Sequence, residues 1–104
     1  MRVFPAMIKL RQLLSEGTIG EVKYVQASLG FPGDEEAISR LSNRSIGGGA
    51  VLDVGVYVIN LATMIFGEKP EVVQSSGWLM PTGVDGFAAI TLKYNYNYIH
   101  RSYI

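Results

Sequence analysis

Three polar side chains stand out on an otherwise apolar stretch of this sequence and could take part in chemistry. Asp53 and Tyr57 are the only ionisable residues between Gly49 and Gly67, and Asn60 follows them within one helical turn. Residues four apart lie one above the other on a helix, so the spacing predicts a polar stripe that carries a carboxylate and a phenol. A phenol whose pKa is near the ordinary value of roughly 10 needs a nearby cation to act as an acid or base at neutral pH.

The helix that must carry this stripe is predicted over residues 48–66, ended by Gly67 and Pro70. Its other side chains are apolar nearly all round, which is typical of a buried helix. A buried carboxylate is costly unless it is paired, so we expect the stripe to meet polar groups, water or a ligand. The apolar run after Asp53 is short for a bilayer span, and Asp53 and Asn60 add to the cost of insertion.

Composition excludes several classes of function. The 104 residues, 48% of them hydrophobic, suffice for one domain with a modest core, or for part of one. Nine basic and nine acidic residues give no net charge to attract nucleic acid or an anionic membrane. There is no cysteine and His100 is the single histidine, so disulfides and thiolate chemistry are excluded and a metal site is disfavoured. The N-terminus lacks the layout of a signal peptide, and we expect a cytoplasmic protein.

The remaining elements follow from hydrophobic period and turn residues. Two late strands joined by a short turn favour antiparallel pairing. The expected fold class is therefore α+β, an open and mainly antiparallel sheet with helices on one face. The expected elements are a helix over 5–16, a strand over 21–31, a surface loop or one short helix over 34–46, and strands over 71–80 and 87–94.

Three phrases of the sequence, in this order, resemble the Gfo/Idh/MocA oxidoreductases. They are Arg2-Val3-Phe4-Pro5, Gly17-Thr18-Ile19-Gly20-Glu21-Val22 and the run from Gly47 to Tyr57. Members of this family are NAD(P)-dependent enzymes with an N-terminal Rossmann domain and a C-terminal α/β substrate domain. The resemblance implies that residues 1–95 are a partial substrate and dimerisation domain and that residues 96–104 are a divergent tail.

The resemblance also implies features that this sequence does not contain. No strand–Gly-x-Gly-x-x-Gly–helix unit occurs, so we expect the Rossmann domain to be absent and the chain to be a truncated product. The full-length family uses NADP(H), and none is expected to bind this chain tightly. Lys69 lies in a Glu-Lys-Pro sequence like the motif that carries the family's catalytic lysine, but that motif belongs to the Rossmann domain. We interpret Lys69 as a solvated cation near a helix end.

Tyr57 is the residue to which the resemblance assigns acid–base chemistry. In the family, a Tyr or His at this place takes the hydroxyl proton as hydride leaves the same carbon for the nicotinamide, beside a lysine of the Rossmann domain. Asp53 is implied to place substrate hydroxyls or to orient Tyr57. From the residues alone, Tyr57 is more simply a core tyrosine, and Asp53 is a carboxylate favoured by the helix dipole.

Other residues carry weaker signals. The resemblance implies that Leu29 and Phe31 form an apolar substrate wall, with ordinary sheet core as the alternative. The cluster Gly47–Gly49 lacks the preceding strand and following Lys-Ser/Thr of a phosphate loop, and we interpret it as allowing close approach of the backbone to a ligand. Trp78 is interpreted as sheet packing or as part of a dimer interface. Gly86 departs from the polar residue that members often carry there. No residue is assigned to a metal or to the cofactor.

Tyrosine at position 57 and the segments 67–71 and 82–85 look most like members that oxidise trans-dihydrodiols of aromatic hydrocarbons and sugars such as D-xylose. The resemblance implies a fragment of an NADP-dependent oxidoreductase that transfers a hydride between such a secondary alcohol and NADP, inactive in isolation. The expected partners are a small-molecule diol or sugar and a second copy bound through the sheet face, with no nucleic acid and no membrane. The alternative is a non-catalytic α+β module that dimerises.

Overall fold

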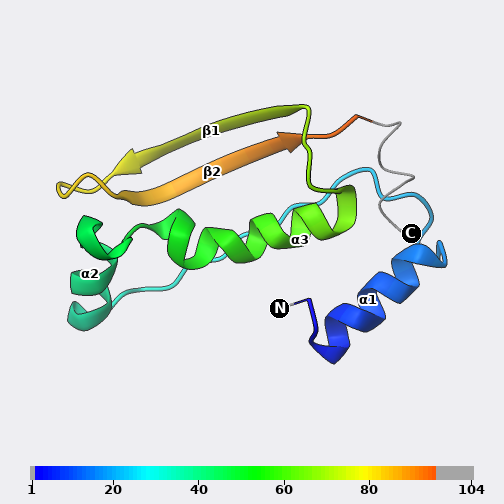
Figure 1. The fold of residues 1–104 in the computed structure, drawn as a ribbon, viewed down its shortest axis with the longest axis horizontal. Coiled ribbons are helices and arrows are strands. Elements are labelled where there is room, and N and C mark those ends of the chain that lie inside the picture. Colours follow the sequence, from blue (N-terminus) through cyan, green and yellow to red (C-terminus); the bar gives the residue numbers. More distant parts are fainter. Residues whose placement is uncertain (1, 96–104) are drawn as a thin grey trace.

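The computed structural model describes residues 2–95, which form helices on one side of a two-stranded sheet (Figure 1). This arrangement confirms the α+β fold class. The polar stretch is a short helix rather than a loop. The elements, in chain order, are α1 (Pro5–Ser15), α2 (Glu35–Leu41), a 3₁₀ turn (Arg44–Ile46), a π-helical turn (Val51–Gly55) that continues as α3 (Val56–Phe66), β1 (Val72–Leu79) and β2 (Asp85–Lys93).

The two strands pair antiparallel, as predicted, with Val72 opposite Lys93 and Trp78 opposite Phe87. The register shifts next to Trp78, and Gly86 is left without a partner residue. A side chain at Gly86 would collide with the ring of Trp78. This bulge gives a local reason for glycine at position 86: the ring of Trp78 occupies the space that a Cβ would need.

The helices cover only part of the sheet. β2 alternates as the sequence predicts, with Ala88, Ile90 and Leu92 partly buried and the residues between them exposed. Every residue of β1 is exposed. In Figure 1, α3 runs beneath β2, and β1 lies beyond it at the margin of the sheet. The helix layer therefore protects one strand and leaves the other open.

The core lies at the C-terminal end of α3. Met64, Ile65 and Phe66 pack with Leu14 of α1, and partly buried side chains from both helices, from the chain between them and from Tyr94 surround them. The ring of Tyr94, just after β2, lies 5.4 Å from that of Phe66. Burial raises the pKa of the Tyr94 phenol above its usual value. The core thus joins α1, α3 and the end of the sheet.

The prediction of a strand over 21–31 is wrong. The structure gives this segment no regular secondary structure and no place in the sheet. Strand assignment requires a hydrogen-bonded neighbour, and Val22 and Val25 pack instead against the core at the end of α3. An apolar pattern alone cannot supply the partner strand that a β-strand needs.

The expectation of a fully buried helix over 48–66 is also wrong in its first half. Leu52 is 61% exposed and Val56 42%, whereas the buried residues of α3 are its last three. A two-stranded sheet and α1 are too small to surround the helix along its length. By length and composition, the helical stretch Arg44–Phe66 could cross a membrane, although core helices of globular proteins pass the same test.

Candidate functional site

A carboxylate from the sheet holds the start of the long helix. Asp85 Oδ2 accepts a hydrogen bond of 2.6 Å from the backbone N–H of Val51. The first N–H groups of a helix have no partner within the helix, and a negative charge there also suits the helix dipole. Gly49 has φ +119°, and a side chain there would collide with the Asp85 carboxylate. Glycine at this position therefore allows the cap to form.

The neighbouring glycine serves the end of α2. A side chain at Gly48 would collide with the backbone carbonyl oxygen of Leu41, and the N–H of Gly49 donates to the same oxygen over 2.8 Å. The close backbone approach predicted for this cluster is thus to the protein itself. Because the Asp85 carboxylate occupies the helix N-terminus, this cluster does not fit the phosphates of a dinucleotide.

Asp53 lies in the π-helical turn and pairs with α2. Its Oδ1 accepts hydrogen bonds from both Nη1 and Nη2 of Arg40, each at 3.2 Å. The Asp53 side chain is 22% exposed and that of Arg40 is 58% exposed. The expectation that the polar stripe meets other polar groups is confirmed here, and the group is a guanidinium that the sequence did not single out.

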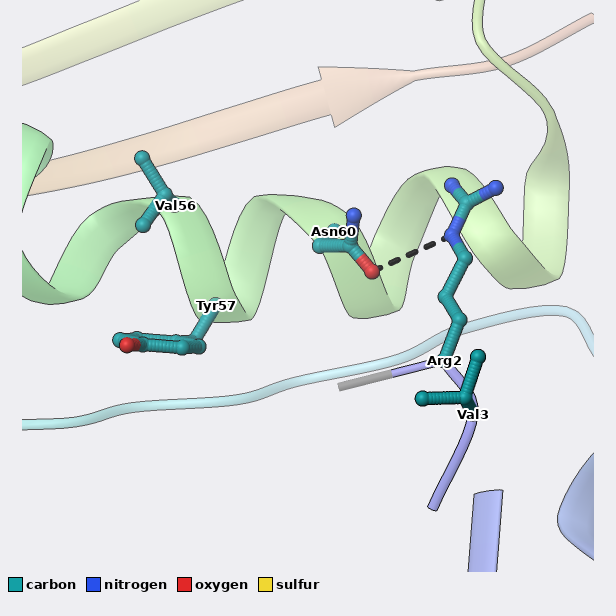
Figure 2. A pocket seen from close by; sticks show the side chains of 5 residues that line it. All are labelled: Arg2, Val3, Val56, Tyr57 and Asn60. Carbon is teal, nitrogen blue, oxygen red and sulfur yellow. Dashed lines mark hydrogen bonds between the residues drawn. The ribbon is translucent and has the colours of Figure 1, made fainter. Parts of the chain in front are cut away.

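Tyr57 lines an open pocket on the helix side of the molecule (Figure 2). The pocket has a volume of about 380 Å³, and its other lining residues are Arg2, Val3, Val56 and Asn60. Half of the Tyr57 surface is exposed, so its phenol is open to a ligand rather than enclosed in a core. The core-tyrosine interpretation is therefore wrong for this residue.

Arg2 fixes the N-terminal segment onto α3. Its Nε donates to Asn60 Oδ1 over 3.2 Å, and its Nη2 donates to Thr63 Oγ1 over 3.1 Å. The Thr63 hydroxyl in turn donates to the backbone oxygen of Asn60. Figure 2 shows Arg2 reaching from the segment before α1 to the helix, one turn away from Tyr57. Sequence reasoning used Arg2 only as part of a family phrase and missed its place in the pocket.

The structure brings some of the predicted site residues together and separates others. Tyr57 and Asn60 share the pocket, but Asp53 is not among its lining residues. A π-helical turn widens the helix at Asp53, so simple i, i+4 stacking with Tyr57 no longer holds. Leu29 and Phe31 are about half exposed and do not line this pocket, and their assignment to a substrate wall stays a prediction.

Other predicted residues lie away from the pocket. Lys69 is exposed beyond the end of α3. His100 and the tail over 96–104 lie outside the described residues. Within residues 2–95, no group of three or more acidic or histidine side chains could hold a metal ion.

Comparison with known proteins places this chain beside one group of enzymes. Residues 7–99 match the GFO/IDH/MocA C-terminal domain. The chain is 42% identical over 95 residues to trans-1,2-dihydrobenzene-1,2-diol dehydrogenase from Danio rerio, 43% over 95 residues to that from Xenopus laevis, and 36% over 94 residues to that from Homo sapiens. Each match covers 89–90% of this chain and 28% of the relative, so the chain spans little more than a quarter of their length.

Proposed function

This chain belongs to the GFO/IDH/MocA oxidoreductase family, whose C-terminal domain it matches over residues 7–99, and from that premise we propose that it supplies the substrate half of a dehydrogenase. The reaction is hydride transfer between a secondary alcohol, either a trans-dihydrodiol or a sugar such as D-xylose, and NADP. The names of the relatives support the diol. The observation that carries the proposal is the half-exposed phenol of Tyr57 in an open pocket.

The proposed roles follow from the position of each group. Tyr57 takes the proton of the substrate hydroxyl as that carbon is oxidised, and returns it in the reverse direction. Asn60, held by Arg2, orients the substrate beside Tyr57. Asp53 lies four residues before Tyr57 and is paired with Arg40. We propose that it either positions a second substrate hydroxyl or stabilises the helix. The catalytic roles of Tyr57 and Asp53 are proposals.

The nicotinamide cofactor requires a site beyond these residues. Residues 2–95 contain one glycine cluster, and its backbone is closed by Leu41 and by the Asp85 carboxylate. We propose that the 104 residues by themselves do not catalyse hydride transfer, because this further site is needed to bind the cofactor. Titration with NADPH, followed by cofactor fluorescence, measures this directly. Micromolar binding by the chain would contradict the proposal.

The acid–base role is best tested in a chimaera, in which residues of this chain replace the matching 95 residues of the Danio rerio relative. Tyr57→Phe is expected to lower kcat by about 10²–10⁴-fold while leaving the affinity for NADP unchanged. Tyr24→Phe is the matched control, because Tyr24 is also exposed and lies outside the pocket. If Tyr57→Phe turns over at the unsubstituted rate, Tyr57 has no part in the mechanism.

A second candidate, a non-catalytic α+β dimerisation module, is favoured by the exposed sheet. Trp78 is 57% exposed and Phe87, opposite it in the sheet, is 52% exposed, and an apolar surface of this kind commonly marks an interface. We propose that this face forms a homodimer of a cytoplasmic protein, with or without catalysis. Sedimentation equilibrium of the chain and of Trp78→Lys tests it. A monomer at all concentrations would exclude the homodimer for this chain.

A further inference from the structure

Arg2 is a cation that, within the described part of the chain, is held in place by neutral partners. Two of its nitrogens donate to Asn60 and Thr63, and both of these bonds are partly buried. Among residues 2–95 the ion pairs are Lys23–Glu21 and Arg40–Asp53, so no described carboxylate neutralises Arg2. A guanidinium bound to two neutral acceptors keeps its full positive charge.

This guanidinium also keeps donors for a ligand. It has five N–H groups, of which the Nε–H and one Nη2–H are used within residues 2–95. The bonds to α3 fix the plane of the fork, so little side-chain freedom is lost when a ligand binds. A planar guanidinium binds a carboxylate with two parallel charge-assisted hydrogen bonds, which are roughly twice as strong as neutral ones.

The pocket places this cation and the reactive phenol apart. Figure 2 shows the Tyr57 ring extending along α3 away from Arg2, with its hydroxyl at the end remote from the guanidinium. Val3 and Val56 also line this pocket, so its lining is partly apolar. A ligand that uses both groups must carry its anionic group several bonds from the hydroxyl that meets Tyr57.

We propose that Arg2 is a specificity-determining residue that makes this pocket prefer a polyol carrying a carboxylate, such as a uronic acid, over the neutral sugar or diol. The proposal rests on the proposed function for the identity of the pocket, but it concerns binding and needs no hydride transfer. D-Glucuronate and D-xylose are a matched pair of probes, because their pyranose rings differ by one carboxylate.

The test titrates the 104-residue chain, ¹⁵N-labelled, with each sugar at constant ionic strength and follows the amide signals of Tyr57 and Asn60. We expect D-glucuronate to bind about tenfold more tightly than D-xylose, equivalent to one charge-assisted pair. Arg2→Gln should remove this preference. Arg11→Gln, which deletes an exposed cation on α1 outside the pocket, should retain it. Equal affinity for the two sugars, or no binding of D-glucuronate, would overturn the proposal.

Two further arms keep the result interpretable. Inorganic phosphate at the same ionic strength should shift Tyr57 and Asn60 less than D-glucuronate does, and equal or larger shifts would mean that any oxyanion suffices. If Arg2→Gln does not fold, a salt titration of the unsubstituted chain takes the place of this variant. The affinity for D-glucuronate should then fall with added NaCl, whereas the affinity for D-xylose should not. If the protein prefers the carboxylate but does not oxidise alcohols, only the proposed dehydrogenase function is contradicted, and the role of Arg2 stands. An active dehydrogenase indifferent to the carboxylate would contradict only the role of Arg2.

Discussion

The two ends of the long helix are held by different kinds of interaction. The last turn of α3 is buried among apolar side chains from α1 and the adjoining chain. The first turns have an exposed apolar surface and are held by single polar contacts, from Asp85 to Val51 and from Arg40 to Asp53. Burial stabilises the C-terminal end of the helix. The N-terminal end is held by a few polar contacts and stays accessible to a ligand. The candidate site lies toward the accessible end, where a substrate can reach Tyr57.

The largest expected effect comes from the buried end. Phe66→Ala should lower the free energy of unfolding by about 3–5 kcal/mol, because it removes a buried ring and leaves a cavity. Urea denaturation followed by circular dichroism measures the loss. Leu52→Ala, at the exposed start of the helix, is the control and should change stability by less than about 0.5 kcal/mol. Similar losses at both sites would remove the contrast between the two ends.

The cap at the open end should matter less for stability. Asp85→Ala leaves the Val51 N–H without its acceptor and should cost about 0.5–2 kcal/mol, the range found for helix N-caps. Asp85→Asn keeps an acceptor oxygen and removes the charge, so its cost should lie between those of the unsubstituted chain and Asp85→Ala. Amide exchange at Val51 should rise more than amide exchange at Ile65. Equal acceleration at both amides would mean that the helix opens as one unit.

Tyr94 gives the buried end a dependence on alkaline pH. Burial raises the pKa of the folded phenol above that of the unfolded chain, so the folded state holds its proton more tightly. Stability from this group is therefore fully present below the ordinary tyrosine pKa and is lost as pH rises through the folded pKa. Tyr94→Phe should flatten the decline in urea midpoint on the alkaline side. An unchanged decline would assign it to other groups.

The smallest stability effect is expected at the exposed ion pair. Arg40→Gln should change the free energy of unfolding by about 0.2–1 kcal/mol, because solvent screens a pair in which Arg40 is 58% exposed. The difference between the two proteins should shrink as NaCl is added. A salt-independent loss of several kcal/mol would show that the open end, too, depends on buried structure.

The sequence predicts much of this fold because period and turn residues act locally. The helix over 5–16, the paired late strands and the alternation of Ala88, Ile90 and Leu92 all follow from neighbours in the chain. Contacts between residues far apart in the sequence were not predicted. Asp85 capping Val51, and Arg2 reaching Asn60 across 58 residues, depend on how elements meet in space. Tyr57 and Asn60 were predicted together, but Asp53 does not line the pocket, and the π-helical turn that contains it has no signal in a 3.6-residue period.

Two attachments, one on each side of Tyr57, fix the number of residues in the helix between Val51 and Asn60. Each residue of an α-helix turns the chain by about 100°, so one inserted or deleted residue here would rotate the two halves of the helix against each other. With Val51 held by Asp85 and Asn60 held by Arg2, such a change would break at least one attachment. Substitutions between Val51 and Asn60 change which side chains are presented, whereas a change in residue number changes where all of them point.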